Sequence, residues 1–258
     1  MLKTLDQSLK VLQFFTKNKP SWGARELAKE GGLNRATIYR ILSTFESNRF
    51  LVKDVVTKNY SLGIRLWDLG LVMYDSLSLS KLVRPILEEL MINTGESVFL
   101  TGLEGEDGLT LEAMEPDNKV TYSVSVGSRV PLYAGASYRA ILAFMDRDII
   151  KQVLSSPLNS YTSATLTNHK KILKKLELIR ENGWAQSEGE YTKDVVAIAV
   201  PLFYNHQDVV GSLTVAGPTY RLTENDIEKN LIYLKEARNK IEIVLQEHQL
   251  NLKMYFKV

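Results

Sequence analysis

The sequence predicts an α+β protein, with a small helical domain at the N-terminal end and a larger domain built on an antiparallel sheet flanked by helices. Three observations predict this class. Apolar residues recur at helical spacing near the N-terminus, strand-like runs separated by helices follow without regular β–α–β alternation, and charge is divided unevenly between the two parts. The 258 residues also exceed one typical domain of about 150 residues.

Composition excludes several classes of protein. The chain has no cysteine, which excludes disulfides, thiolate zinc sites, iron–sulfur clusters and cysteine nucleophiles. Its three histidines share no metal-ligand spacing, so we expect no metal and no other cofactor. The longest apolar run, 195–204, is half the ~20 residues of a membrane span, and charges near the N-terminus argue against a signal peptide. We therefore expect a soluble, cytoplasmic protein with no membrane partner.

Positive charge is concentrated at the N-terminal end. Residues 1–62 hold 11 basic and 5 acidic residues, a net charge of +6, whereas residues 63–258 hold 21 basic and 25 acidic residues, a net charge of −4. A basic domain attached to an acidic remainder indicates a polyanionic partner for the basic part.

The N-terminal residues show the pattern of three helices. The first begins near Thr4 and ends at 18–20, with one apolar face made of Leu5, Leu9, Leu12 and Phe15. A short helix over 23–29 follows, and Gly31-Gly32 provides the backbone freedom of a tight turn. Asn34 is a good N-cap for a third helix running to about Ser47.

The third helix carries the functional prediction. One side is a core stripe of Ile38, Ile41, Leu42 and Phe45. The other side and the first turn present small, hydroxyl and arginine side chains, namely Arg35, Ala36, Thr37, Tyr39, Arg40, Ser43 and Thr44. Arginine can bind guanine bidentately, hydroxyls can hold phosphates, and Ala36 allows a close backbone approach. We therefore expect this helix, with its cap Asn34, to enter the major groove of double-stranded DNA.

A small hairpin follows the third helix. Apolar runs at 50–52 and 60–62 flank a polar stretch over 53–59. Lys53 and Lys58 lie on its expected tip, where their charges suit backbone phosphates. The three helices and this wing predict a winged helix-turn-helix domain over 1–62.

The second part of the chain mixes helices and strands. Residues 63–80 suit a linker helix with a break at 76–80 and a dimer contact made of Leu66, Leu69, Val72 and Met73. Alternating residues over 120–126 predict a half-buried strand, and 195–203 with 209–216 predict a buried hairpin. A helix over 167–182 should end at Gly183. The side chains that we expect on its inward face are Ile172, Leu173, Leu176 and Ile179. Thr223 begins a capping-box pattern for a long last helix.

Three groups of residues resemble one protein family. The first group lies in the first domain and consists of Gly32–Leu42 and Tyr60-Ser61-Leu62-Gly63. The second lies early in the second domain and consists of 84–87, 94–98 and 126–136. The third lies near the end and consists of Gly183, Ser187, Glu190 and 197–203. They resemble the IclR-type bacterial transcription regulators over nearly the whole chain. The resemblance implies a GAF-like effector-binding domain over 81–250, a tail over 251–258, and a tetramer formed through effector domains.

The resemblance also implies where an effector binds. A turn matching the family's pocket segment would offer its backbone N–H groups to a carboxylate, and the opposite floor would be lined by side chains of the sheet. The residues are Leu132, Tyr133, Ala134, Gly135, Ala136, Ser187, Ala197, Thr214 and Ala216. We therefore expect a small organic acid as effector. The chain departs from the family pattern at Tyr133, Tyr138-Arg139, Ala197 and Asn205.

Catalysis finds little support in the sequence. Residues 135–139 begin like a nucleophile elbow, but Arg139 replaces its second glycine. The acidic residues Glu104, Glu106, Asp107 and Glu112 suit a solvated hairpin surface rather than a catalytic pair. We therefore predict that the chain has no catalytic residue. We predict a transcription regulator, a repressor rather than an activator, that self-associates as a dimer or tetramer. A sensor acting through protein contacts and a small-ester hydrolase using Ser137 are the alternatives.

Overall fold

The computed structural model describes residues 2–16, 18–76, 79–117, 120–205 and 207–252. The chain divides into two compact units, Met1–Ser78 and Leu79–Val258, here called unit 1 and unit 2. No described helix is both long enough and apolar enough to cross a membrane.

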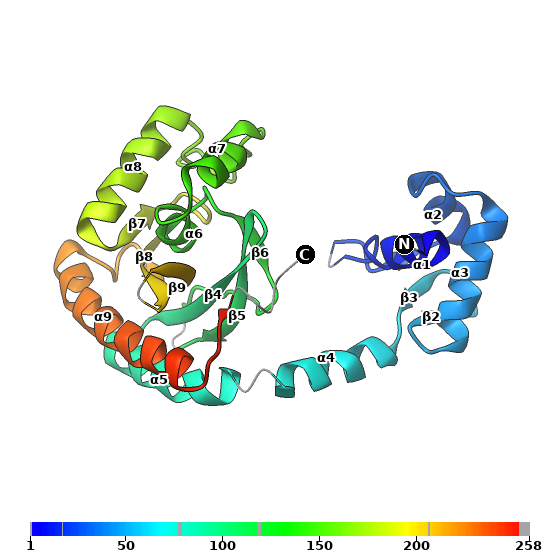
Figure 1. The fold of residues 1–258 in the computed structure, drawn as a ribbon, viewed down its shortest axis with the longest axis horizontal. Helices are drawn as coiled ribbons and strands as arrows, with labels where there is room; N and C mark the ends of the chain where they lie inside the picture. The colour runs from blue at the N-terminus through cyan, green and yellow to red at the C-terminus, as the bar shows by residue number, and fades with distance from the viewer. Residues whose placement is uncertain (1, 17, 77–78, 118–119, 206, 253–258) are drawn as a thin grey trace. The chain divides into compact units, whose positions relative to one another are not determined.

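Unit 1 contains three helices, a small sheet and a fourth helix that leads to the end of the unit (Figure 1). In chain order the elements are α1 (Lys3–Leu12), β1 (Ser21–Trp22), α2 (Ala24–Glu30), α3 (Arg35–Ser47), β2 (Leu51–Lys53), β3 (Tyr60–Leu62) and α4 (Ile64–Ser76). The three expected helices and the hairpin are present. The sheet has the order β1-β3-β2, so the hairpin gains a third strand that the sequence pattern did not indicate.

The apolar face expected for α1 is only partly buried. Leu5 and Leu9 are 54% and 52% exposed, whereas Val11 and Phe15 are buried in the core of unit 1. The reason is that α1 meets the core at its C-terminal end and in the turn that follows. Its first two turns therefore leave their leucines in solvent.

Gly63 fixes the junction between the hairpin and α4. Its N–H donates to the carbonyl of Phe50 at 2.8 Å, and a Cβ at this position would lie 2.2 Å from the Arg49 carbonyl oxygen. Only glycine fits this approach. The break expected over 76–80 spans residues 77–78, which lie outside the described residues; α4 ends at Ser76 and the next helix begins at Leu79.

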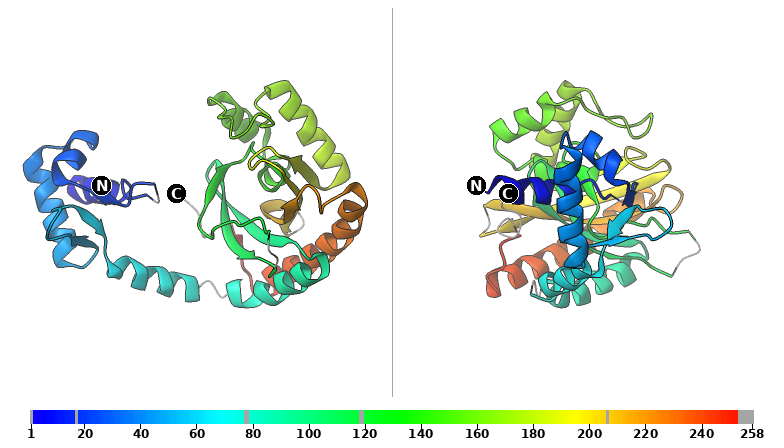
Figure 2. Two further views of the ribbon diagram at one scale, coloured as in Figure 1. Left: turned by 180° about the vertical axis from the view of Figure 1, so that it is seen from behind. Right: turned by 90° about the vertical axis from the view of Figure 1, so that its right-hand side faces the viewer.

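Unit 2 is an antiparallel sheet with helices on both faces (Figures 1 and 2). Its strands are β4 (Ser97–Glu104), β5 (Asp107–Met114), β6 (Arg129–Pro131), β7 (Ala185–Glu188), β8 (Val195–Tyr204) and β9 (Asp208–Pro218), in the order β6-β5-β4-β9-β8-β7. Its helices are α5 (Leu79–Thr94), α6 (Ala136–Leu142), α7 (Arg147–Ser155), α8 (His169–Asn182) and α9 (Glu224–Glu247). Helices α5 and α9 pack together on one face, and α6 packs on the other with α8 behind it. This arrangement confirms the α+β class.

Three local predictions for unit 2 are confirmed. Strands β8 and β9 form the expected hairpin, with Ala197 opposite Ala216. Gly183 ends α8 in the left-handed conformation at φ 75°. At the start of α9, the Thr223 N–H donates to Asp226 Oδ2 at 3.0 Å and the Thr223 side chain accepts from the backbone N–H of Asp226, which is the expected capping box.

The strand expected over 120–126 is wrong. Residues 120–126 have no strand pairing; β5 pairs on that side with β6, through residues 107–109 and 129–131. The segment is held by side chains rather than by a ladder. Arg221 donates to the carbonyl of Val120 at 3.0 Å, and the Tyr122 and Phe99 ring centroids are 6.3 Å apart.

The expected inward position of Leu173 is also wrong, since this side chain is 44% exposed. Ile172, Leu176 and Ile179 lie on one line along α8 and are buried. Leu173 lies about 100° around the helix from Ile172. The packed stripe of α8 is too narrow to include it.

Candidate functional site

The outward side of α3 is positioned by a cap and by a buried stripe. Asn34 Oδ1 accepts a hydrogen bond from the Thr37 N–H at 2.8 Å, which satisfies a free donor at the start of the helix. The opposite side is anchored in the core of unit 1 by Ile38, Ile41 and Leu42, each 4% exposed or less. The helix can therefore turn only one face to solvent.

That face carries the predicted DNA contacts. Thr37 is half-buried, and the others are exposed: Asn34, Arg35, Ala36, Tyr39, Arg40 and Ser43. Thr37 and Arg40, with Thr44, also border a groove of about 470 Å³ between α3 and the first turns of α1. The structure thus gathers these residues on one accessible surface, and their contact with DNA stays a prediction.

The two wing lysines occupy different positions. Lys58 is exposed at the turn between β2 and β3, in the left-handed conformation at φ 59°. Lys53 ends β2, half-buried, with its Nζ 5.3 Å from the centroid of the Tyr60 ring; interaction with Tyr60 raises the pKa of Lys53. Asp54 closes the turn by accepting from the N–H groups of Val56 and Thr57 at 2.9 and 2.6 Å.

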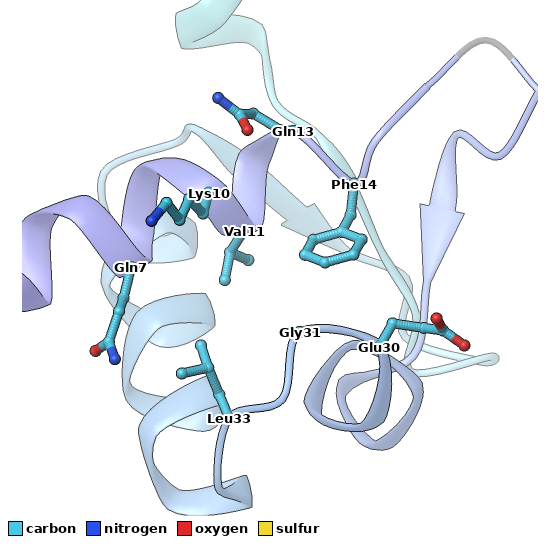
Figure 3. A pocket seen from close by; sticks show the side chains of 8 residues that line it. All are labelled: Gln7, Lys10, Val11, Gln13, Phe14, Glu30, Gly31 and Leu33. Atoms are coloured by element: carbon cyan, nitrogen blue, oxygen red, sulfur yellow. The ribbon is translucent and has the colours of Figure 1, made fainter. Parts of the chain in front are cut away.

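A second hollow in unit 1 lies away from the α3 face. It measures about 410 Å³ and separates the end of α1 from the turn between α2 and α3 (Figure 3). Its lining residues are Gln7, Lys10, Val11, Gln13, Phe14, Glu30, Gly31 and Leu33. None of the predicted DNA contacts lies among them.

Unit 2 holds a small cavity at the start of α6. Its volume is about 30 Å³, room for little more than one or two water molecules. Its lining residues are Phe99, Tyr122, Gly135, Ala136, Ser137, Tyr138, Ser187, Glu190, Tyr191, Thr192, Val195 and Ala197. The cavity thus brings together four of the predicted effector residues, Gly135, Ala136, Ser187 and Ala197.

The other predicted effector residues lie beside the cavity rather than on its wall. Leu132, Ala134, Thr214 and Ala216 are completely buried. Thr214 is one layer behind the wall, where its Oγ1 is 2.5 Å from the hydroxyl of Ser137. Tyr133 donates its hydroxyl to the carbonyl of Asn159 at 2.9 Å, and it borders a separate hollow near that loop.

The polar groups on the cavity wall are bonded to one another. The Ala136 N–H, which belongs to the turn that the family resemblance implies for a carboxylate, donates to Ser187 Oγ at 3.0 Å. Gly135 makes the turn possible, because its φ of 89° is a conformation that side chains disfavour. In this state a serine hydroxyl therefore occupies the hydrogen-bonding position that a ligand oxygen could take.

A buried ion pair lies beside these groups. Arg139, which is 0% exposed, donates to Glu190 at 2.5 and 2.7 Å and to the carbonyl of Tyr133 at 3.2 Å. Its Nε has no partner among the described residues. The two hydrogen bonds of such a bidentate pair offset part of the cost of removing both charges from water. The pair leaves the wall with no net charge and fixes the turn that carries Glu190.

Aromatic side chains enclose the rest of the cavity. Tyr138 packs its ring so closely on Gly108 that a Cβ there would lie 2.4 Å from the ring. Burial raises the pKa of Tyr122, Tyr138 and Tyr191, so these hydroxyls keep their protons and can donate. The same cause, with Tyr133 nearby, raises the pKa of Tyr161 to about 12.

A loop covers the turn that carries Glu190, Tyr191 and Thr192. Thr162 donates to the carbonyl of Gly189 and Thr165 to that of Glu190, each at 2.6 Å. The Tyr161 and Tyr191 ring centroids are 4.6 Å apart. Two segments distant in sequence therefore close this side of the cavity together.

Sequence reasoning missed most of the aromatic wall. Glu190 was among the residues that carry the family resemblance, so the sequence did single it out. The rings of Phe99, Tyr122 and Tyr191 come from a strand and two irregular segments, so no periodicity relates them. Only the tertiary structure places them around one cavity.

Two residues considered for catalysis have other surroundings. Ser137 is buried, and its described partner is the hydroxyl of Thr214. Glu112 is not on a solvated surface as expected; it is 2% exposed and accepts from Arg84 at 3.3 Å. The reason is that β5 turns this residue toward α5, which covers that face of the sheet.

Family models cover most of the chain. The IclR helix-turn-helix domain matches residues 4–55, and the bacterial transcriptional regulator IclR C-terminal domain matches residues 72–243. The HTH-type transcriptional regulator KipR of Bacillus subtilis (strain 168) is 32% identical over 91% of this chain and 92% of its own length. The transcriptional repressor IclR of Escherichia coli (strain K12) is 24% identical over 92% and 88% of the two chains.

Solved structures share the fold. The IclR transcriptional regulator of Alicyclobacillus acidocaldarius has a TM-score of 0.82 and 28% identity over 94% of this chain and 98% of its own. An IclR homologue from Microbacterium hydrocarbonoxydans, complexed with 4-hydroxybenzoate, has a TM-score of 0.78 and 24% identity over 97% and 99% of the two chains.

Proposed function

The chain belongs to the IclR family of bacterial transcriptional regulators, and from this we propose that it binds one operator sequence through α3 under the control of a small organic acid bound in unit 2. We propose that it acts in the cytoplasm as a repressor, as the name of its Escherichia coli relative suggests. In this proposal, residues 1–62 bind DNA, residues 63–80 form a linker, residues 81–250 bind the effector, and residues 251–258 form a tail.

The exposed side of α3 carries the DNA-binding part of this proposal. Arg35 and Arg40 are free of ion pairs among the described residues, so their guanidinium groups are available to bases or phosphates. The contacts we propose are Asn34, Arg35, Ala36, Thr37, Tyr39, Arg40 and Ser43 in the major groove, with Lys53 and Lys58 on the backbone. A single domain of this size reads few base pairs, so useful specificity needs at least two copies.

Self-association is supported by the exposed apolar side chains of α4. Leu69 and Val72 are 44% and 68% exposed, and Ile64 and Trp67 are 63% and 64% exposed on the same helix. The side chain of Met73 lies outside the described residues. We propose that α4 contacts its counterpart in a second copy, and that unit 2 provides the further contact of a tetramer.

Effector binding is supported by the wall of the cavity at α6. A carboxylate could accept from the Ala136 N–H in place of Ser187 Oγ, next to Gly135. The remaining proposed residues are Leu132, Tyr133, Ala134, Ala197, Thr214 and Ala216. Because the cavity holds only about 30 Å³, an acid must displace the Ser187 hydroxyl and move the covering turn. Binding would thereby favour a second conformation of unit 2, which is the requirement for allosteric control.

Fluorescence anisotropy tests the DNA-binding part. The purified chain is titrated with duplex DNA from upstream of its own gene and with a scrambled duplex, at several salt concentrations. We expect selective binding whose logarithm falls steeply with the logarithm of salt concentration. Arg40→Ala should weaken operator binding by about 1–3 kcal/mol and reduce the selectivity, whereas Lys58→Ala should weaken both duplexes about equally.

Two results would contradict this proposal. Unchanged selectivity in Arg40→Ala removes Arg40 from base recognition. Absence of binding at low salt, with or without added carboxylic acids, overturns the DNA-binding function and favours a sensor that acts through protein contacts.

A further inference from the structure

A cluster of lysines lies on the solvent side of α8. Its members are Lys170, Lys171, Lys174 and Lys175, all exposed, and we call them the α8 lysines. Helix α8 lies at the periphery of unit 2 (Figures 1 and 2), and its buried side is occupied by Ile172, Leu176 and Ile179. The α8 lysines therefore form an open, positively charged surface.

The charges of the α8 lysines disfavour, rather than stabilise, the helix that carries them. No ion pair involves an α8 lysine among the described residues. Lys170 and Lys174, and likewise Lys171 and Lys175, are four residues apart on the helix, where like charges repel. Lys170 and Lys171 also lie in the first turn of α8, which contains no acidic residue. The positive end of the helix dipole disfavours cations at this position. Folding alone gives no reason for this arrangement.

The surrounding charge makes the cluster distinct. Within residues 63–258, α8 holds five of the 21 basic and two of the 25 acidic residues, so the remainder holds 16 basic and 23 acidic residues. A helix with net charge +3 thus belongs to an otherwise acidic unit. Helix α3 has a similar start, with an asparagine whose side chain caps the helix, a cation in the first turn and no acid there.

We propose that the α8 lysines bind the sugar–phosphate backbone of the DNA, as a contact that is independent of base sequence. Lysines are compact charges on flexible stems, which suits phosphates, and no arginine among them offers bidentate base recognition. The α8 lysines thus add affinity without selectivity. This inference rests on the proposed DNA-binding function.

The test compares two double variants of equal charge change in the full chain. Lys170→Gln with Lys174→Gln removes two α8 lysines, and Lys229→Gln with Lys235→Gln removes two lysines of α9 as the matched control. Anisotropy titrations with the operator duplex and a scrambled duplex over a salt series give the slope of log affinity against log salt. Circular dichroism verifies folding, and relief of the repulsion on α8 should leave the first variant at least as stable as the parent.

In the α8 variant we expect the slope of log affinity against log salt to become shallower by about 0.9 for each removed lysine that contacts a phosphate. The change should be the same for both duplexes, so the ratio of their affinities should stay unchanged. The α9 variant should keep the parent slope. An unchanged slope in the α8 variant, or an equal loss in both variants, overturns the inference. Loss of oligomer mass without a change of slope assigns the α8 lysines to an acidic surface of a second copy, and it also overturns the inference.

The two proposals can fail separately. If the parent protein binds both duplexes equally and the α8 variant still lowers the slope, the operator function fails while the α8 contact stands. If the parent is selective and the α8 variant behaves like the control, only the α8 contact fails. Absence of any DNA binding overturns both.

Discussion

The proposed DNA contacts on α3 come from one helix and its cap, whereas the cavity of unit 2 is lined by strands, a helix and two irregular segments. The α3 residues are mostly exposed and have few partners, so each can change with little effect on the others. The cavity residues bond to one another, as Ser187 does to Ala136 and Arg139 to Glu190. The difference indicates that substitutions in the cavity should affect stability together with binding, while substitutions on α3 beyond its cap Asn34 should affect binding alone.

The largest effect should come from the buried ion pair. Glu190→Gln keeps the size of the side chain but leaves the Arg139 charge buried and unpaired, because Arg139 is 0% exposed. We expect a loss of about 3–5 kcal/mol in the free energy of unfolding. Urea denaturation measures it, and hydrogen exchange should locate the loosening in unit 2 rather than in unit 1.

An exposed pair provides the control. Glu89→Gln breaks the pair between Glu89 and Lys240, whose side chains are 54% and 48% exposed, and should cost at most about 1 kcal/mol. Equal losses of unfolding free energy in the two variants would show that the pair of Arg139 and Glu190 behaves like an exposed pair. The proposed difference between the bonded cavity residues and the exposed α3 residues would then lose its support.

An intermediate effect should come from the cap of α3. Asn34→Ala removes the acceptor of the Thr37 N–H and should cost about 1 kcal/mol. Hydrogen exchange of peptides from α3 should increase, while peptides from unit 2 stay unchanged. Asn34→Ser retains a capping oxygen and should lose only a few tenths of a kcal/mol; equal losses in the two variants would argue against the cap.

The smallest effect concerns the turn between β4 and β5. Burial, with Glu104 and Glu106 nearby, raises the pKa of Asp107. Because the folded state holds this proton more tightly, its stabilising contribution is present at low pH and is lost as pH rises through the raised pKa. Asp107→Asn should therefore be more stable than the parent at pH 7, by up to about 0.5 kcal/mol, and the difference should shrink at pH 3. A difference that is independent of pH contradicts this assignment.

The sequence alone determined the elements whose signals are local. The end of α8 at Gly183, the N-cap at Asn34 and the capping box at Thr223 depend on residues a few positions apart. The apolar stripe of α3 repeats at the helical period, so the outward face follows from the inward one. The hairpin of β8 and β9 needed only two apolar runs and a short turn.

Only the tertiary structure decided the features that depend on distant partners. Residues 120–126 alternate like a strand, yet they pair with no strand and are held through Arg221 and the ring of Phe99. Glu112 lies on a polar-looking hairpin, yet α5 covers it. The cavity combines Phe99, Tyr138 and Tyr191 with Ser187, whose hydroxyl accepts from the Ala136 N–H. Each outcome depends on contacts between residues far apart in the chain, and the local periodicity of a sequence does not record them.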